Sequence, residues 1–161
     1  MSEDAAPTPI EQRVSAGLFA IRLSPVVFLM LAAMAYVFHV EGSDAYAWRN
    51  TLPLWLVIVL GWVALRAGRG HWAGAGWRWP VAAAGFAIPA TGLTLYLHYG
   101  FATDLDGMYS NAVYPEELFR FLPWYTLVAG FTGAAIGWIV GRNVDETRSR
   151  RASARADAPT L

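Results

Sequence analysis

The chain has 161 residues, of which 56% are hydrophobic and only 15% are charged. Soluble domains carry about a quarter charged residues, and the apolar residues here are concentrated in four blocks, as in membrane spans. The formal net charge is zero, so no excess of positive charge indicates a nucleic-acid partner. Because the chain has no cysteine, disulfides, thiolate catalysis and cysteine-ligated zinc or iron–sulfur sites are excluded. The sequence predicts an all-α fold: a four-helix transmembrane bundle in the lipid bilayer.

The chain begins with a polar segment, and we interpret residues 1–17 as a cytoplasmic N-terminal tail. A cleaved signal peptide is the alternative, but the segment is acidic, whereas signal peptides begin with basic residues. The first span is predicted at about 18–40, with Arg22 near its start. One face of this span combines small residues with a terminal histidine, and we expect it to pack on other helices: Pro25, Phe28, Ala32, Ala35 and His39.

The second span is predicted at about 52–67, which is short, so its helix is alternatively expected to begin near Ala45. The loop that follows contains four glycines together with Arg66, Arg69 and Arg78. Glycine-rich backbone has no preference for a helix, so we predict a flexible connection.

The third span is predicted at about 80–99 and carries no charge. Pro89 lies near its middle and deprives the Gly85 carbonyl of its helical donor. Small and polar residues share a face that we expect to point into the bundle, namely Ala84, Ala87, Thr91, Thr94 and His98. The bulky residues Phe86, Leu93, Leu95 and Leu97 are predicted on the opposite side. Pro89, Thr91 and Thr94 form a polar bundle face, which is the basis of one functional hypothesis below.

The fourth span is predicted at about 120–141 and contains the most specific packing motif, a repeat of small residues that lets two helix backbones approach closely. The repeat comprises Gly130, Gly133, Gly137 and Gly141. It predicts packing either on a helix of the same chain or on a second copy through the fourth span. Residues 142–161 are predicted to be a disordered cytoplasmic tail whose arginines contact anionic lipid.

Arginine placement predicts the orientation of the bundle. The N-terminal segment, the second loop and the C-terminal tail hold ten arginines, whereas the first and third loops hold only Arg49 and Arg120. By the positive-inside rule both termini are predicted to be cytoplasmic, in the inner membrane of a bacterial cell. The acidic first and third loops are then outside. Within the third loop, Asp104-Leu105-Asp106-Gly107 lacks an acidic position that a calcium loop requires, so we interpret it as a turn.

The two histidines that end the first and third spans are candidate ligands. His39 follows Arg22 by 17 residues and His98 follows Arg78 by 20, so both are expected near the outer surface at similar depth. Facing each other, they would form a cofactor site for haem b. With Glu41, Asp104 or Asp106 they would instead hold a divalent metal. The alternative is that both rings belong to the interfacial aromatic belt and bind no ligand.

Three functional hypotheses follow from these residues. The sequence lacks phosphate-binding glycine loops, nucleophile elbows and zinc-protease motifs, which favours a role other than an enzyme. The first hypothesis is a non-catalytic subunit or accessory factor of a larger membrane complex, with other membrane subunits as partners. The second is a haem- or metal-binding redox protein that uses His39 and His98. The third is a small-molecule carrier that uses the face near Pro89, Thr91 and Thr94.

Overall fold

The computed structural model describes residues 9–42, 45–107, 109–112, 114 and 117–156. In this part of the chain every regular element is helical: α1 (Pro9–Glu41), α2 (Ala45–Asn50), α3 (Leu52–Ala67), α4 (Arg78–Thr103), the short 3-10 helix η1 (Leu105–Gly107) and α5 (Glu117–Ala156).

Four of the helical segments are long and apolar enough to cross a membrane, namely Ala16–Glu41, Tyr46–Ala67, Arg78–Thr103 and Glu117–Ala156. The second of them joins α2 to α3, so the helix begins close to Ala45, as the alternative start predicted. The prediction of an all-α protein with four helices long and apolar enough to span a membrane is confirmed for the described residues.

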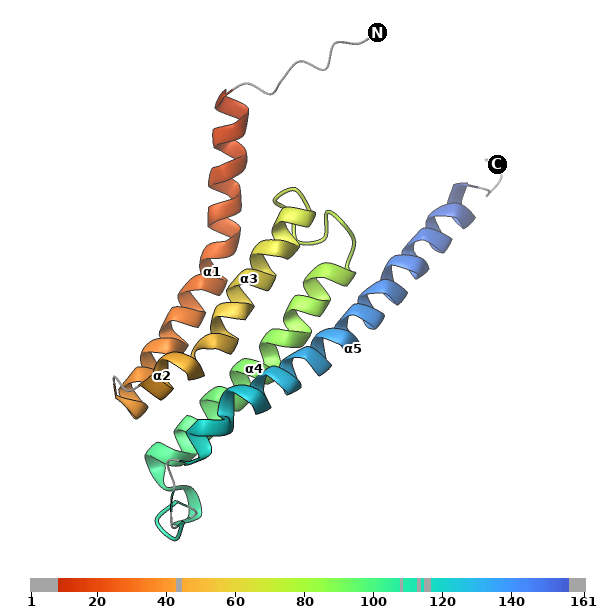
Figure 1. Ribbon diagram of the computed structural model, residues 1–161. Helices are drawn as coiled ribbons and strands as arrows, with labels where there is room; N and C mark the ends of the chain where they lie inside the picture. The colour runs from red at the N-terminus through yellow and green to blue at the C-terminus, as the bar shows by residue number, and fades with distance from the viewer. Residues whose placement is uncertain (1–8, 43–44, 108, 113, 115–116, 157–161) are drawn as a thin grey trace.

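The four long helices run alternately up and down (Figure 1). The beginning of α1, the connection from α3 to α4 and the end of α5 lie together at one end, which we call the arginine end. The end of α1, α2, the end of α4 and the beginning of α5 lie at the other, which we call the α2 end.

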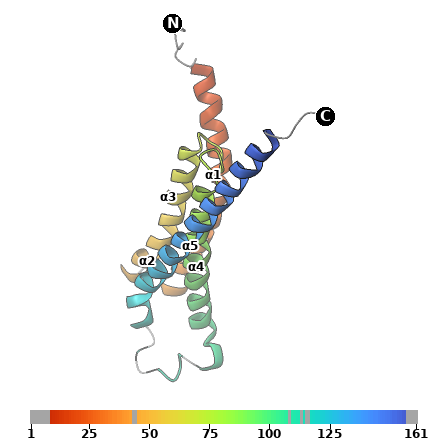
Figure 2. The ribbon, with the colours of Figure 1, turned by 90° about the vertical axis from the view of Figure 1, so that its right-hand side faces the viewer.

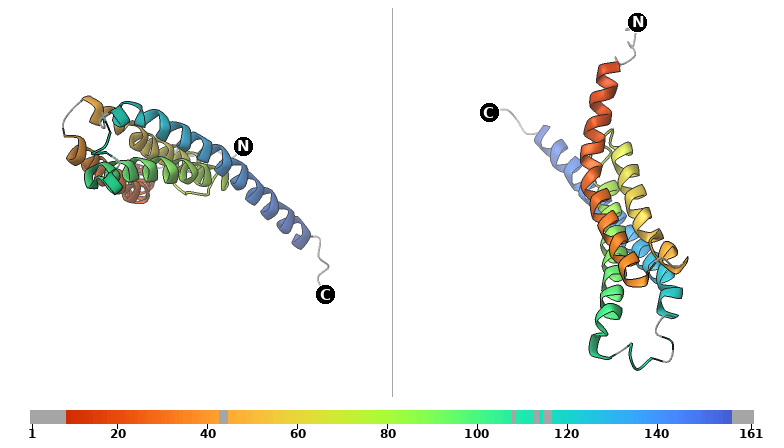
Figure 3. Two further views of the ribbon diagram at one scale, coloured as in Figure 1. Left: turned by 90° about the horizontal axis from the view of Figure 1, so that it is seen from below. Right: turned by 90° about the vertical axis from the view of Figure 1, so that its left-hand side faces the viewer.

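The bundle is open between its first and last helices. α4 packs along α5 over most of its length and also contacts α1 and α3, while α1 packs mainly on α3. α1 and α5 lie on opposite sides of the molecule (Figures 2 and 3). In a closed four-helix bundle the first and last helices would be neighbours. Here α4 is the central helix instead.

The glycine repeat of the fourth span lies against α4 of the same chain. A Cβ atom added at Gly133 would lie 2.9 Å from Pro89 Cγ and would clash with the Gly85 carbonyl oxygen. A Cβ at Gly137 would clash with the Val81 carbonyl. These distances mean that the two backbones touch, so the repeat is occupied within one chain along its whole length. We call this contact the glycine seam: Gly130, Gly133, Gly137 and Gly141 of α5 against α4.

The Gly85 carbonyl released by Pro89 belongs to this seam. Pro89 has no N–H to donate to it, and the Gly133 backbone lies against it instead. Close contact with a glycine Cα is a recurrent way of satisfying part of such a carbonyl between helices. The kink therefore serves helix packing.

Phe86 corrects the prediction for the third span. It was expected among the outward residues, yet it is fully buried, whereas Ala84 is exposed. The reason is Gly130, where an added Cβ would lie 2.7 Å from Phe86 Cε2. The missing side chain on α5 makes room for a large ring on α4. The buried face of α4 is rotated accordingly and contains Phe86, Ala90, Thr94 and His98.

The first span corrects a second prediction. The face expected to pack on other helices is exposed throughout: Pro25, Phe28, Ala32, Ala35 and His39, with Phe28 77% exposed. α1 instead buries another face, which joins the core cluster with Leu54 and Val57 of α3. That face comprises Met30, Ala33, Met34 and Val37. The bulkier side chains bury more apolar area against α3 and α4 than the alanine face would.

The chain ends also differ from the prediction. α1 begins at Pro9, inside the segment predicted as a tail, and α5 continues to Ala156, where disorder was predicted. No glycine or proline interrupts the chain between Gly141 and Pro159, and Arg142 pairs with Glu146 one turn later at 2.8 Å. The spanning helix has already supplied the nucleus, so extension is favourable. Residues 1–8 and 157–161 lie outside the described residues.

The glycine-rich connection between α3 and α4 forms a series of tight turns. Gly70 and Gly76 adopt positive φ angles of 85° and 99°, which favour glycine. The Arg22 guanidinium donates to the Gly70 carbonyl at 2.5 Å, and this bond ties α1 to the connection. The turns and this bond define the path of the connection, and its flexibility stays a prediction.

Candidate functional site at the α2 end

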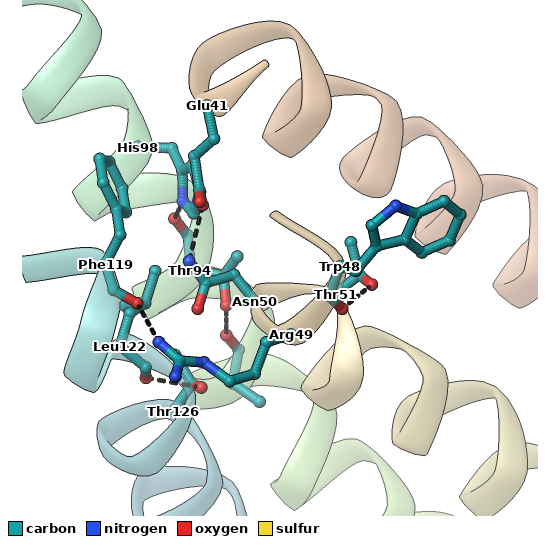
Figure 4. Close-up of polar contacts among 11 residues, drawn as sticks. Glu41, Trp48, Arg49, Asn50, Thr51, Thr94, His98, Phe119, Leu122 and Thr126 are labelled. Carbon is teal, nitrogen blue, oxygen red and sulfur yellow. Dashed lines mark hydrogen bonds and ion pairs between the residues drawn. The ribbon is translucent and has the colours of Figure 1, made fainter. Parts of the chain in front are cut away.

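A buried pair of ionisable side chains joins α1 to α4. Glu41 Oε1 lies 2.5 Å from His98 Nε2, and the two side chains are 3% and 0% exposed (Figure 4). Glu41 is the last residue of α1, and His98 lies one turn before the end of α4. Since burying ionisable groups is costly unless they are paired and hydrogen-bonded, this pair is the candidate functional site.

The second ring nitrogen of His98 fixes the position of one proton. Nδ1 lies 2.6 Å from the Thr94 carbonyl oxygen, which can only accept a hydrogen bond. Nδ1 therefore carries a proton. The short contact between Nε2 and Glu41 needs one further proton between its two atoms, because two lone pairs would repel. A hydrogen bond that contains one proton therefore joins Glu41 to His98.

Asn50 at the end of α2 binds the same carboxylate. Its Nδ2 donates to Glu41 Oε1 at 2.8 Å, and the residue is 1% exposed. α2 ends there because Pro53 of α3 has no N–H to donate to the Arg49 carbonyl. The Thr51 hydroxyl donates to the Trp48 carbonyl at 2.7 Å. The break between α2 and α3 places Asn50 over the Glu41–His98 pair.

Arg49 connects α2 to the beginning of α5. Its Nη2 donates to the Phe119 carbonyl at 3.2 Å and to the Arg120 carbonyl at 2.7 Å. In a regular helix the Phe119 carbonyl would accept from the N–H four residues later, but that residue is Pro123. Arg49 therefore satisfies a carbonyl that the α5 proline leaves free (Figure 4).

Aromatic rings close the site on the α5 side. The Phe119 ring lies 5.0 Å from the His98 ring and 4.7 Å from the Phe101 ring, centroid to centroid. Tyr109 of the following loop adds an edge contact to Phe101 at 5.4 Å. These rings exclude water from the Glu41–His98 pair and lower the local dielectric constant, which strengthens each hydrogen bond of the pair.

Two buried polar atoms of the site have no partner within the described residues: Arg49 Nε and Asn50 Oδ1. One is a donor and the other an acceptor. The site thus keeps several polar groups buried, most of them paired with one another.

The histidine partner predicted for His98 is elsewhere. His39 is exposed on α1, while His98 bonds to Glu41 and Thr94. The structure thus brings together His98 and Glu41 from the predicted metal-ligand set, and not His39. In the described part of the chain no three His, Asp or Glu side chains form a group that could hold a metal ion.

The two loop aspartates of that set lie in the turn after α4. Asp104 Oδ1 accepts from the backbone N–H groups of Tyr109 and Ser110, each at 2.9 Å. Hydrogen bonding from the Ser110 side chain and backbone lowers the pKa of Asp104 below its ordinary value of 3.8. Asp106 belongs to η1 with a φ of 57°. Both residues act as turn formers, as the sequence indicated.

The residues of the polar bundle face predicted around Pro89 make their contacts with other residues of the same chain. The Thr94 hydroxyl donates to the Ala90 carbonyl at 2.8 Å, and the Thr91 hydroxyl lies 3.7 Å from Met30 Sδ. Pro89 packs at the glycine seam. These residues line the contacts of α4 with its neighbours.

Sequence reasoning missed Arg49 and Asn50 as members of the site. The signal for Arg49 was available in Pro123, because a proline early in a helix leaves a carbonyl for an outside donor. No comparable signal marks Asn50, whose place in the site depends on the break after α2.

Comparison with known proteins finds no family model, no curated protein and no solved structure that matches this chain.

Proposed function

We propose that this protein is a non-catalytic subunit or accessory factor of a membrane complex, and that α1 is the helix that meets its partner. The observation that carries the proposal is the uncovered face of α1: Pro25, Phe28, Ala32, Ala35 and His39. No other helix of the described chain packs on it.

The residue types on this face suit a helix better than lipid. Ala32 and Ala35 leave a shallow surface, which lets a second backbone approach closely, whereas lipid chains gain nothing from small side chains. His39 at its end offers a hydrogen-bonding ring to that neighbour at the membrane surface. The glycine seam is already filled by α4, so the partner's surface is on α1 and not on the small-residue face of α5.

The other functional hypotheses receive less support from the contacts. A haem or metal site needs an imidazole lone pair, and both ring nitrogens of His98 are engaged. A carrier face needs free polar groups, and the Thr94 hydroxyl is bonded to its own helix. The buried pair is therefore interpreted as part of the scaffold that holds α1 in place.

The orientation belongs to the same proposal. With the arginine end in the cytosol, both termini are cytoplasmic, and the α2 end faces outward from the inner membrane of a bacterial cell. Ten of the twelve arginines support this direction. A topology reporter fused after Leu161 tests it, and activity seen only outside the cell would reverse the orientation.

The partner proposal is tested with Ala35→Leu against Ala84→Leu, the same change at an exposed alanine of α4. The tagged chains are extracted from native membranes in mild detergent. We expect one polypeptide in fixed stoichiometry with the wild type and with Ala84→Leu, and its loss with Ala35→Leu while that variant stays monodisperse. A wild-type chain that migrates alone as a monomer, or a partner retained by Ala35→Leu, would refute the proposal.

A further inference from the structure

The last fifteen residues of α5 form an exposed helical arm. The arm, Arg142–Ala156, continues α5 beyond the glycine seam and diverges from α1 at the arginine end (Figures 1 and 3). From Glu146 to Ala156 every side chain is exposed. The arm carries five arginines and two acids, so its charge is positive.

Three arginines of the arm share one helical face, which we call the arginine stripe: Arg148, Arg151 and Arg155. They follow one another at steps of three and four residues. Traced back along α5 in four-residue steps, the same face passes through Val144, Val140 and Ile136. Val140 is 48% and Ile136 59% exposed, so this face of the spanning segment points to lipid.

The two acidic residues of the arm are engaged on other faces. Asp145 caps the beginning of α4, where its carboxylate accepts from the Trp77 N–H at 2.8 Å and from the Arg78 N–H at 3.4 Å. Glu146 pairs with Arg142. The charge of the arginine stripe is therefore not neutralised by the acids of its own helix.

The stripe also borders a shallow hollow on the same face. Its lining joins the last lipid-facing valines to the first arginines, namely Val140, Asn143, Val144, Thr147, Arg148 and Arg151. Apolar groups at one side of a hollow and guanidinium groups at the other match a molecule with an acyl part and an anionic head. Guanidinium groups bind phosphate oxygens in a bidentate manner.

We propose that the arginine stripe binds the headgroups of anionic phospholipid in the leaflet at the arginine end. A side chain that follows the lipid-facing residues on the same helical face, just beyond the hydrocarbon, meets the headgroup layer. Positive charge in that layer attracts anionic lipid. Figure 1 shows α5 inclined relative to the upper part of α1, so that the arm extends sideways away from α1. The proposal does not depend on a partner at α1.

The test uses the full chain in bilayers of phosphatidylcholine with a minor fraction of phosphatidylglycerol. Electron paramagnetic resonance of spin-labelled lipids gives the association constant of each lipid for the protein, relative to the other. We expect phosphatidylglycerol to be preferred at low salt and the preference to fall at high salt, because exposed charges are screened.

Two double variants with equal loss of charge locate the site. Arg151→Gln/Arg155→Gln removes two members of the stripe, and we expect the preference to fall by roughly twentyfold, since each arginine near an anionic surface contributes about a factor of five. Arg142→Gln/Arg150→Gln removes two arginines from the other faces of the arm and is expected to keep most of the preference.

Three results would overturn the proposal. Equal association of both lipids with the wild type would exclude lipid selection, and would favour a soluble acidic partner for the arm. If the preference for phosphatidylglycerol fell equally in both double variants, it would come from the total charge of the arm and not from the arginine stripe. Competition by glycerol phosphate as effective as that by intact phosphatidylglycerol would assign the stripe to a free phosphate compound.

Discussion

The two ends of the bundle handle charge in opposite ways. At the α2 end Glu41 and His98 are buried and share one proton, and Arg49 is bonded to carbonyls of α5. At the arginine end Arg148, Arg151 and Arg155 are exposed. The first arrangement connects α1, α2, α4 and α5. In the second, Arg148 lies over the Trp77 ring at 4.9 Å, and Arg151 and Arg155 are exposed for contacts outside the chain.

This difference decides how each end responds to a change. A buried charge that loses its partner cannot recover hydration, so truncation at the α2 end is costly. An exposed charge keeps its water and is screened by salt, so single truncations at the arginine end have small effects on stability. Stability should therefore depend on the α2 end, and interactions with lipid on the arginine end.

The largest effect is expected from His98→Ala, which leaves Glu41 buried with Asn50 as its remaining partner. Breaking a buried ion pair costs about 3–5 kcal/mol, whereas hydrogen bonds between membrane helices average about 0.6 kcal/mol. We expect the free energy of unfolding in detergent to fall by the larger amount. Glu41→Gln should cost much less, because an amide nitrogen in place of Oε1 can donate to His98 Nε2 and, once the Asn50 amide turns over, to Asn50 Oδ1. A loss for His98→Ala near 0.6 kcal/mol would contradict the contrast between the ends.

A smaller loss is expected from Arg49→Met, which removes both bonds to the first turn of α5. Hydrogen bonds that involve a charged group contribute about 1.5–3 kcal/mol, and Pro123 leaves the Phe119 carbonyl without a substitute. Hydrogen exchange in the first turns of α5 should rise together with the loss of stability.

The control for this variant is Arg120→Met at the same end. Arg120 is exposed and its guanidinium lies over the Phe121 ring at 5.6 Å, so its removal should cost less than about 1 kcal/mol. If the two variants lost equal stability, position at the α2 end and not bonding to α5 would explain both results.

Much of the fold follows from sequence patterns, because hydrophobic length and arginine placement act locally. The four spans needed no tertiary information, and the glycine repeat correctly indicated a face for close packing. The sequence pattern did not predict which face of α4 is buried, because Phe86 is buried only where Gly130 of α5 leaves room for its ring. Likewise the face of α1 that is buried depends on the side chains that α3 and α4 present to it.

The site was predicted in part for the same reason. Placing the ends of the first and third spans at one surface brought Glu41 and His98 to the same level, and the structure joins them. Which side chain of α1 turns inward was not decided by periodicity, because His39 and Glu41 lie two residues apart and about 200° around the helix. The packing of Met34 and Val37 selects Glu41.

At the arginine end, the group with the largest expected contribution to stability is Asp145, which caps α4 from α5. Asp145→Ala should reduce the free energy of unfolding by about 1 kcal/mol, as for other side-chain caps. Glu146→Ala breaks only an exposed pair within α5 and should cost less than about 0.5 kcal/mol. A cost for Asp145→Ala as high as that for His98→Ala would mean that the two ends contribute equally to stability.

The smallest effect concerns Asp104, which lies beyond α4 near the α2 end. It is half-buried, and its carboxylate accepts hydrogen bonds from its own loop and not from another helix. Hydrogen bonding from Ser110 holds its pKa below the ordinary 3.8, so the bonds favour the folded loop above that value. They are lost as the pH falls through the lowered pKa, because protonation removes the acceptor. Amide exchange at Tyr109 and Ser110 should therefore lose protection only in acid, with the helices unchanged. In Asp104→Asn that acid step should disappear. Cooperative unfolding of the bundle over the same pH range in the wild type, absent from Asp104→Asn, would show that a carboxylate bonded only within its loop contributes as much as the buried Glu41.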